Sequence, residues 1–557
     1  MKIAIDSGLV TISGSGVAFL KLKTLIAKRL GNVYKEGRDF VTLPVSTLPL
    51  IQDLIEGDKT DKLIKYIEPF EKHSMAREKA IAMIETESTD GVTTPWIQLL
   101  DPAQSTAVAA MVLPDLLGLC LFDEQGSGKT VMSIAAFDIL KDANIIDRMI
   151  VVCPKSMVGE WPKDISRFTK DKHKVVLAEG DKRQKYDAAL EEFDVLVTNY
   201  EGVEVMLTSL VASSQMKKHL LVVDESYYLK NSETIRAEIV MKLRAYCNRC
   251  FVLCGTPAPN SAYDLVNQFN LADLGYTFGG FSKSKDQEKD LENISKLLDD
   301  RGLFIRRLKD DILKDIPTKD FHVVSIELIG KQALMYDKAR SELELELKTF
   351  NNETFRKHLA TYFQRRSILL QICSCPGSID PTFSDIPAKY IALDELLDRL
   401  IKENRKVVIW TFFKNSIDEL YMRYAHFNPV KIDGRVYSTS ARRAAVTAFQ
   451  EDPKTMLFIG NPAAAGAGIT LHAAYDAVYV SYSNQAAHYL QSLDRIHRRG
   501  QISSHVNYYL FACKGTIEET EIVRLRGKEI RQHNILGDHI SWPTSLDDAL
   551  RELTAHA

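Results

Sequence analysis

Residues 116–140 read LLGLCLF-DEQGSGKT-VMSIAAFDIL: an apolar run, a glycine-rich turn and a helical period in direct succession. An apolar strand that leads through glycines into a helix is the context in which backbone N–H groups and a helix N-terminus bind phosphate. A lysine there reaches the β- and γ-phosphates, and the following threonine hydroxyl suits Mg²⁺. The pattern predicts a nucleotide-binding phosphate loop. Its predicted ligands are Gly126, Ser127, Gly128, Lys129 and Thr130.

Short apolar runs alternate with helical periods on both sides of a central helical region. Runs that are buried on both faces and followed by helices predict parallel sheets covered on both sides. In the first half these runs are LLGLCLF, MIVVCP, DVLVTNY, LLVVDE and RCFVLCG; in the second they are KVVIWTF, PVKIDG, TMLFIG, AVYVSY and VNYYLF. The first stretch, KIAIDSGLVTI, reads as a short hairpin because Asp6 interrupts what would be the apolar core of a signal peptide.

Composition narrows the function. The chain has 557 residues, enough for about three or four domains at about 150 residues each. Lys plus Arg is 71 and Asp plus Glu is 74, so the net charge is -3. A protein that coats nucleic acid should be basic overall, so any such contact must be local. Basic residues are concentrated at 21–38. They form either a solvated helix face or a contact with DNA.

Cysteine usage and hydropathy point to an intracellular protein. The spacing of the eight cysteines does not indicate a disulfide framework. Cys247 and Cys250 form a lone CxxC, and adding Cys373 and Cys375 as further ligands makes only a weak case for a zinc site. No 18-residue uncharged apolar run is present, so we expect no membrane insertion.

Two further groups suit ATP hydrolysis. Asp224 and Glu225 end an apolar run, where Asp224 can hold Mg²⁺ and Glu225 can polarise the attacking water; the alternative is a helix N-cap pair. Arg495 and Arg498 are three residues apart, so a helix would place both on one face. From there they could stabilise the charge on the γ-phosphate of ATP. The alternative is a basic helix on the surface.

The order of the motifs resembles the Swi/Snf-type helicase-like ATPases of helicase superfamily two, with a DEAH-like box, and short bacterial or phage members above all. The resemblance covers about residues 95–530 and is carried by DEQGSGKT, VVCPKSMVGEW, VTNYE, VVDESYYLKN, CGTPAPN, FIRRLKDDILKDIPTK, AAAGAGITL, QSLDRIHRRGQ and GTIEE. The arginine-rich FIRRLKDDILKDIPTK resembles the family's own linker, which separates this family from RNA helicases.

The resemblance also implies an organisation. It implies an α/β fold with two RecA-like parallel-sheet lobes, helical insertions and a small N-terminal α+β domain. The predicted segments are an accessory, substrate-recognition domain at 1–90, a first ATP-binding lobe at 91–282, linker and helical insertions at 283–385, a second lobe at 386–535 and a C-terminal tail at 536–557.

By the same resemblance, LLDPAQ gives Gln104 as the residue that reads adenine, although Asp101 and Ala103 depart from the family's pattern. Gln491 and Gly468 would complete the ATP site from the second lobe. Tyr227 stands where the family usually has His, which changes its expected link to Gln491. The implied cofactors are ATP and Mg²⁺. The implied DNA contacts are Lys155, Thr198, Asn199 and Thr470.

The resemblance implies an ATP-driven translocase on double-stranded DNA. The leading hypothesis is a monomer in the cytoplasm of a bacterium or phage-infected host that remodels forks, branched DNA or recombination intermediates, working with replication, repair or recombination proteins. The alternatives are a translocase that displaces bound polymerase or repressor from duplex DNA, and a DNA-binding scaffold without catalysis. The intact set of phosphate-loop, acidic and arginine residues favours a catalyst over a scaffold.

Overall fold

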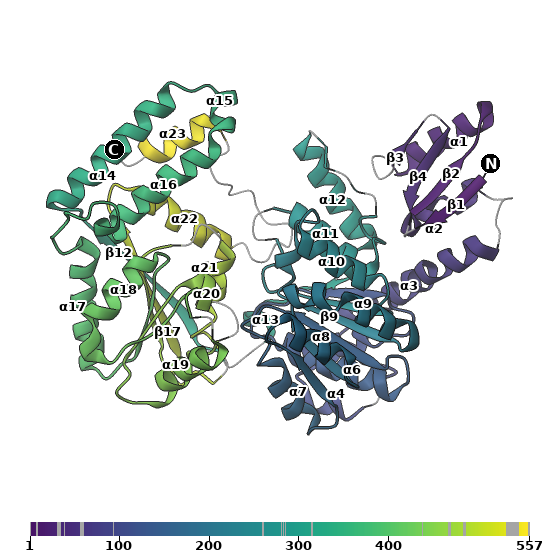
Figure 1. Ribbon diagram of the computed structural model, residues 1–557, viewed down its shortest axis with the longest axis horizontal. Coiled ribbons are helices and arrows are strands. Elements are labelled where there is room, and N and C mark those ends of the chain that lie inside the picture. Colours follow the sequence, from purple (N-terminus) through teal and green to yellow (C-terminus); the bar gives the residue numbers. More distant parts are fainter. Residues whose placement is uncertain are drawn as a thin grey trace. The chain divides into compact units, whose positions relative to one another are not determined.

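The computed structural model divides the chain into two units, Met1–Ile312 and Leu313–Ala557 (Figure 1). It describes all residues except 1, 7–8, 31–34, 38, 56–60, 93, 259–260, 280, 282, 285, 313–315, 437, 466–468, 483–485, 499, 531–544 and 555–557. The predicted linker and insertion segment, 283–385, contributes to both units. No helix among the described residues is long and apolar enough to cross a membrane.

The first unit is built on a seven-stranded sheet in the order β11-β5-β10-β9-β6-β8-β7, with every pair parallel. The strands are β5 Gly118–Leu121, β6 Arg148–Cys153, β7 Val175–Ala178, β8 Val195–Asn199, β9 His219–Asp224, β10 Arg249–Leu253 and β11 Phe304–Ile305. β5, β6, β8, β9 and β10 are the five predicted apolar runs. β8, β9 and β10 are buried along their whole length, as helix-covered parallel strands should be.

Helices follow most of these strands and place polar side chains at the strand ends. They are α4 Pro95–Leu99, α5 Pro102–Met111, α6 Lys129–Asp142, α7 Trp161–Thr169, α8 Lys182–Leu190, α9 Tyr200–Met216, α10 Ile235–Arg244, α11 Tyr263–Asp273, α12 Gln287–Arg301 and α13 Lys309–Ile312, with the 3₁₀ helix η3 at Ser226–Leu229. Because all strands run the same way, the loops after β5, β8 and β9 lie along one edge of the sheet.

The N-terminal segment forms a separate antiparallel sheet in the order β1-β2-β4-β3. Its elements are β1 Lys2–Asp6, β2 Leu9–Ser13, α1 Gly16–Leu30, β3 Lys35–Glu36, β4 Phe40–Pro44, α2 Leu48–Ile51 and the 3₁₀ helices η1 Val45–Thr47 and η2 Gln52–Ile55. The pairing of β1 with β2 confirms the hairpin expected at the start of the chain. Phe19 and Ile26 of α1 belong to one apolar core with Val10 and Ile12 of β2.

Helix α3, Asp61–Glu85, joins this small sheet to the first unit's main core. Its first half packs on the small sheet through Leu63, Ile67 and Phe70. Its second half contributes to the core of the seven-stranded sheet through Ala76, Ala80 and Met83. Therefore the residues predicted as an accessory domain, 1–90, include a helix that the first lobe needs for its own core.

The second unit is built on a six-stranded parallel sheet in the order β12-β17-β16-β13-β15-β14. Its strands are β12 Thr318–Ile326, β13 Val407–Trp410, β14 Val430–Ile432, β15 Leu457–Gly460, β16 Asp476–Tyr479 and β17 His505–Cys513. Its helices are α14 Gly330–Lys348, α15 Asn352–Lys357, α16 Leu359–Ser374, α17 Ala388–Lys402, α18 Lys414–Arg423, α19 Thr439–Glu451, α20 Pro462–Ala465, α21 Ala486–Leu493, α22 Ile517–Ile530 and α23 Leu546–Thr554, with the 3₁₀ helices η4 Pro376–Ser378 and η5 Ala425–Phe427.

These sheets confirm the expected α/β fold with two parallel-sheet lobes, helical insertions and a small N-terminal α+β part. Three strands of the two parallel sheets were not predicted. β12 lies in the segment read as mostly helical, because its sequence, TKDFHVVSI, is largely exposed and carries no continuous apolar run. β11 spans two residues and forms only because the linker returns beside β5. β7 is an edge strand that pairs with β8 alone.

Candidate active site

The phosphate loop connects β5 to α6 in the first unit. Gly126 and Gly128 have φ angles of +86° and +90°, in the left-handed region that favours glycine. Helix α6 begins at Lys129 with Gly128 as its N-cap. Thr130, the predicted Mg²⁺ ligand, is half-buried in the helix's first turn. The loop thus presents its backbone and the positive end of the helix dipole to one point, as phosphate binding requires.

Lys129 and Gln104 both contact the loop itself. The Lys129 ammonium donates to the carbonyl oxygens of Asp123 and Glu124, at 2.7 and 3.1 Å. The Gln104 amide nitrogen donates to the Ser127 carbonyl at 2.9 Å, and its oxygen accepts from the Asp101 backbone at 3.2 Å. Gln104, which the resemblance gave as the residue that reads adenine, lies at the loop with both ends of its amide bonded to the protein.

The predicted acidic pair ends β9. Asp224 is buried and accepts hydrogen bonds from the Trp161 indole at 3.0 Å and from the Glu225 backbone at 2.9 Å. Burial raises the pKa of Asp224, while the Trp161 bond and the Lys129 charge act the other way. A carboxylate has about four lone-pair positions, so two remain for a cation or a metal-bound water.

Glu225 is held in an unusual conformation. Its backbone is left-handed, with φ +52° and ψ +51°, which is uncommon outside glycine and is found at functional sites. Its carboxylate accepts a hydrogen bond of 2.9 Å from the Gln125 amide of the phosphate loop. The two motifs, separated by a hundred residues of sequence, are therefore joined directly by side chains.

Two buried hydroxyls support a polar ligand here. The Ser127 Oγ and Thr256 Oγ1 atoms are inaccessible to solvent and make no hydrogen bond to any described residue. A buried hydroxyl without a partner costs free energy, about 1–3 kcal/mol. Ser127 lies in the phosphate loop itself, so phosphate oxygens are the acceptors that this position suits. The residues present therefore fit a nucleoside triphosphate with a divalent cation.

Sequence reasoning assigned no role to two residues that hold the acids. Trp161, fully buried at the start of α7, binds Asp224 as described. The Tyr200 hydroxyl donates to the backbone carbonyls of Asp224 and Glu225. Trp161 lies in the motif VVCPKSMVGEW and Tyr200 in the motif VTNYE. The sequence did not show that both residues bind the acidic pair. Two linker residues also bind near the loop: the Arg306 guanidinium donates to the Gly255 carbonyl at 2.9 Å, and the Arg307 guanidinium pairs with Asp123.

The structure corrects the expected helical placement of the two arginines. Helix α21 contains Gln491, which is buried, and ends at Leu493, so Arg495 and Arg498 lie in the turns beyond it. Arg495 is buried and donates to the carbonyls of Gln491 and Ile469, at 2.7 and 3.1 Å. These carbonyl bonds, rather than a shared helix face, fix its position.

Arg498 is half-buried, and its guanidinium donates to the hydroxyl of Thr470. One predicted arginine finger is thus bonded to one predicted DNA contact inside the second unit. Gly468, the predicted nucleotide contact of this unit, lies outside the described residues.

The predicted DNA contacts of the first unit differ in exposure. Lys155 is exposed. Thr198 has no exposed side-chain surface, and its hydroxyl donates to the Ala178 carbonyl at 3.4 Å, so this conformation does not offer it to a phosphate. Asn199 is nearly buried and accepts from the Lys185 ammonium at 3.0 Å. Lys185, which the sequence did not single out, adds a positive charge beside the predicted contact.

The eight cysteines are all buried and form no disulfide. Burial raises the pKa of both Cys247 and Cys250 to about 12, which disfavours the thiolate that zinc needs. The candidate pair Cys373 and Cys375 belongs to the other unit, so the weak zinc hypothesis has no support among the described residues.

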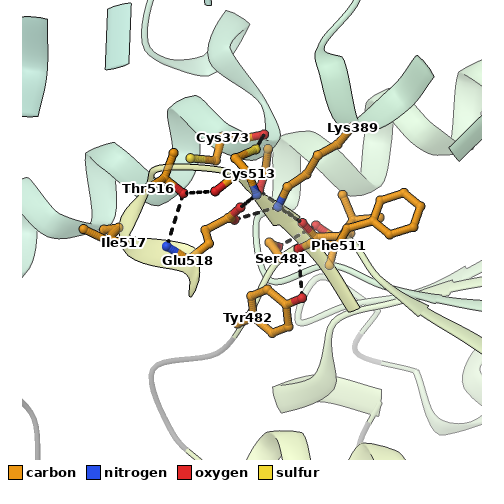
Figure 2. A network of polar contacts seen from close by, with 12 residues as sticks. Cys373, Lys389, Ser481, Tyr482, Phe511, Cys513, Thr516, Ile517 and Glu518 are labelled. Atoms are coloured by element: carbon orange, nitrogen blue, oxygen red, sulfur yellow. Dashed lines mark hydrogen bonds and ion pairs between the residues drawn. The ribbon is translucent and has the colours of Figure 1, made fainter. Parts of the chain in front are cut away.

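A second buried cluster closes the sheet of the second unit. Figure 2 shows Lys389, Cys513 and Glu518 pointing toward one another, with Cys373 nearby. The Lys389 ammonium donates to the Glu518 carboxylate at 2.6 Å, and the other carboxylate oxygen accepts from the Cys513 backbone at 3.0 Å. Because an ammonium already occupies the place of a cation, this cluster is a structural ion pair that anchors the GTIEE segment.

Two family models match the chain. The SNF2-related domain matches residues 63–377, and the helicase conserved C-terminal domain matches residues 388–500. The first match spans more than half of the 557 residues. The chain therefore belongs to the SNF2-related family, which confirms the Swi/Snf-type resemblance. It carries the domain pair of a helicase-like ATPase.

Similar proteins agree with this assignment. A CHD3-type chromatin-remodeling factor of Arabidopsis thaliana is 28% identical over 461 residues, covering 77% of this chain and 37% of the relative. An uncharacterized ATP-dependent helicase of Mycoplasma genitalium is 26% identical over 434 residues, covering 76% of this chain and 40% of the relative. The chain thus spans about two fifths of the length of these relatives.

A solved structure, the Sulfolobus solfataricus SWI2/SNF2 ATPase core in complex with dsDNA, is 22% identical. The match covers 82% of this chain and 97% of that one, with a TM-score of 0.35. The two parallel sheets of this chain establish its fold independently of this similarity.

Proposed function

We propose that the protein is an ATP-driven translocase on double-stranded DNA. The observation that carries the proposal is the direct bond between Gln125 of the phosphate loop and Glu225 of the acidic pair, with Lys129 in the same loop. This arrangement brings a phosphate-binding loop and a water-polarising carboxylate together in one site. Membership of the SNF2-related family supports the same reading.

Each side chain then has a chemical task. Lys129 and the loop backbone would hold the β- and γ-phosphates, and Thr130 and Asp224 would hold Mg²⁺. Mg²⁺, when bound, neutralises charge that develops on the phosphate oxygens. Glu225 would orient and polarise the attacking water. Arg498, on the second unit, would stabilise the charge of the transition state, and Gln104 would contact the adenine.

DNA would be held by local backbone contacts, not by a basic shell. The net charge of -3 argues against a strongly basic surface, and phosphate contacts of this kind give salt-dependent, sequence-independent affinity. Lys155, Asn199 and Thr470 are the proposed contacts, with Lys185 added because its ammonium binds Asn199.

For the biological task we propose remodelling of forks, branched DNA or recombination intermediates. The small antiparallel sheet supports a separate recognition surface, since Phe40, the first residue of β4, is 43% exposed and Lys21 is exposed on α1. We further propose that the protein acts as a monomer with replication, repair or recombination proteins, in the cytoplasm of a bacterium or phage-infected host. The reduced, buried cysteines support that compartment.

ATPase turnover with duplex, forked and single-stranded DNA and with RNA tests this function. We expect DNA duplexes to stimulate turnover most, and Lys129→Ala and Glu225→Gln to abolish it. Stimulation by RNA above the level of duplex DNA would contradict the proposal, and turnover that survives both substitutions would contradict the roles of Lys129 and Glu225.

The recognition surface needs its own test. Removing residues 1–90 would delete α3 and part of the first lobe's core, so surface substitution is the better design. Lys21→Glu combined with Phe40→Ala should reduce fork stimulation and leave duplex stimulation unchanged; the exposed Lys289→Glu is the control. A fork preference that persists would reject this surface. Roadblock displacement on linear duplex without any fork effect would favour the alternative of a protein-displacing translocase.

A further inference from the structure

The linker that leads to the second unit is also the outer strand of the phosphate-loop sheet. β11 pairs with β5, and the Phe122 backbone N–H donates to the Ile305 carbonyl at 2.8 Å. The pairing continues beyond the strand, because the Glu124 N–H donates to the Arg307 carbonyl at 3.0 Å. The linker therefore runs beside the first residues of the phosphate loop.

Charged side chains fix this course. The Asp123 carboxylate, fully buried, accepts from the Arg307 backbone at 2.9 Å and from its guanidinium at 3.1 Å, with a second guanidinium bond to the other oxygen. Glu124 accepts from the Lys309 backbone N–H at 2.9 Å. Breaking such a buried ionic contact is costly, so the linker is held firmly against the loop.

The side chain of Lys309 then extends over the loop. A Cβ atom placed on Gly126 would lie 3.0 Å from the Lys309 Cε and 3.5 Å from its Nζ. Lys309 is 1% exposed, so its ammonium is held inside the site and not in solvent. A side chain at position 126 would crowd the end of Lys309, and the φ of +86° also favours glycine there. The loop thus has two lysines: Lys129 of its own helix, and Lys309 from the linker.

We propose that Lys309 binds a phosphate oxygen of the nucleotide, which makes the linker part of the ATP site. The inference rests on the proposed ATP-binding function of the loop. A buried ammonium against a phosphate loop has the charge and reach to donate to a phosphate oxygen, and charge-assisted hydrogen bonds are the strong ones. Because the chain passes from Lys309 directly into the second unit at Leu313, phosphate binding acts on the segment that connects the two units.

Equilibrium binding of a fluorescent ATP analogue and of ADP to the full-length protein, without DNA, tests the role of Lys309. Lys309→Met should lower ATP affinity by about tenfold or more and should flatten the dependence of affinity on ionic strength, which a purely structural role would not change. Lys289→Met, at an exposed lysine of the same unit, is the matched control and should bind like the wild type. If Lys309→Met lowers the melting temperature, Lys309→Gln, which keeps a polar end, takes its place.

The outcomes separate the two ideas. Wild-type protein that binds neither ATP nor ADP would overturn the proposed function together with this inference. Wild-type protein that binds ATP, with a folded Lys309→Met variant of equal affinity and equal salt dependence, would overturn the inference alone.

Discussion

The two parallel sheets of this protein place their buried charges differently. In the first unit, the buried Asp123 and Asp224 lie at the ends of β5 and β9 beside the half-buried Lys129 of the phosphate loop, while other buried charges such as Arg244 bind backbone carbonyls elsewhere. In the second unit, buried ion pairs join one helix to another: Lys389 of α17 binds Glu518 of α22, and Arg366 of α16 binds Glu552 of α23. The first unit thus has buried carboxylates beside its proposed ATP site, and the second unit has buried ion pairs between its helices.

The largest expected effect is on ATP turnover, and ATP affinity should distinguish a substitution in the second unit from one in the first. Arg498→Ala should reduce ATP turnover by about a thousandfold, as loss of an arginine finger does, and leave ATP and DNA binding nearly unchanged. Lys129→Ala should also abolish turnover but should weaken ATP binding. Steady-state turnover and nucleotide affinity, measured together, check this. A loss below about tenfold for Arg498→Ala would contradict its role as a finger.

A stability measurement tests the assembly role of the second unit's charges. Glu552→Gln leaves Arg366, whose side chain is 2% exposed, without one of its two carboxylate partners, and should cost about 3–5 kcal/mol of unfolding free energy in that unit. Urea denaturation measures the change. Glu353→Gln is the control, because its exposed pair with Lys357 should contribute less than about 1 kcal/mol. If the two variants lose equal unfolding free energy, the buried pair does not stabilise the second unit more than an exposed pair does.

A smaller effect should follow from the bond between Thr470 and Arg498. Thr470→Val removes the hydroxyl that holds the guanidinium and should lower turnover by roughly tenfold, the value of one hydrogen bond to a charged group. Thr470→Ser keeps the hydroxyl and should retain most of the activity. If Val and Ser variants behave alike, the hydroxyl does not position the arginine.

The smallest effect concerns pH and the helix α3. Burial, together with the charges of Arg244, Arg77 and Arg249, lowers the pKa of His73 to about 3. The His73 ring accepts a hydrogen bond from the Leu117 N–H at 3.2 Å. The unfolded chain takes up a proton below about pH 6.5 while the folded chain does not, so His73 should lower the first unit's stability as pH falls, by up to about 1.4 kcal/mol per pH unit.

His73→Gln should remove this part of the pH dependence. Urea midpoints of wild type and variant at pH 7 and pH 5 measure it. Burial raises the pKa of Asp273 to about 6, which acts in the opposite direction below pH 6 but is common to both proteins and cancels in the comparison. Parallel pH curves for the two proteins would show that His73 does not stay neutral.

The motifs predicted the residues of the phosphate loop and of the acidic pair. Gly126, Gly128 and Lys129 occupy a loop whose conformation follows from local sequence, since glycine alone adopts these φ angles freely. Arg495 and Arg498 show the limit, because a spacing of three indicates a shared face only if the helix continues, and α21 ends first. Thr198 shows another limit, because its burial depends on the neighbouring strand β7.

The sequence by itself determined the α/β fold, the ten apolar strands and the residues of the phosphate loop and acidic pair, because periodicity and glycine spacing are local properties. Only the tertiary structure decided which distant residues meet: Gln125 with Glu225, Trp161 with Asp224, and Lys309 with Gly126. These contacts form because parallel strands end at one edge of a sheet, and strand order within the sheet, which the sequence does not state, selects the neighbours.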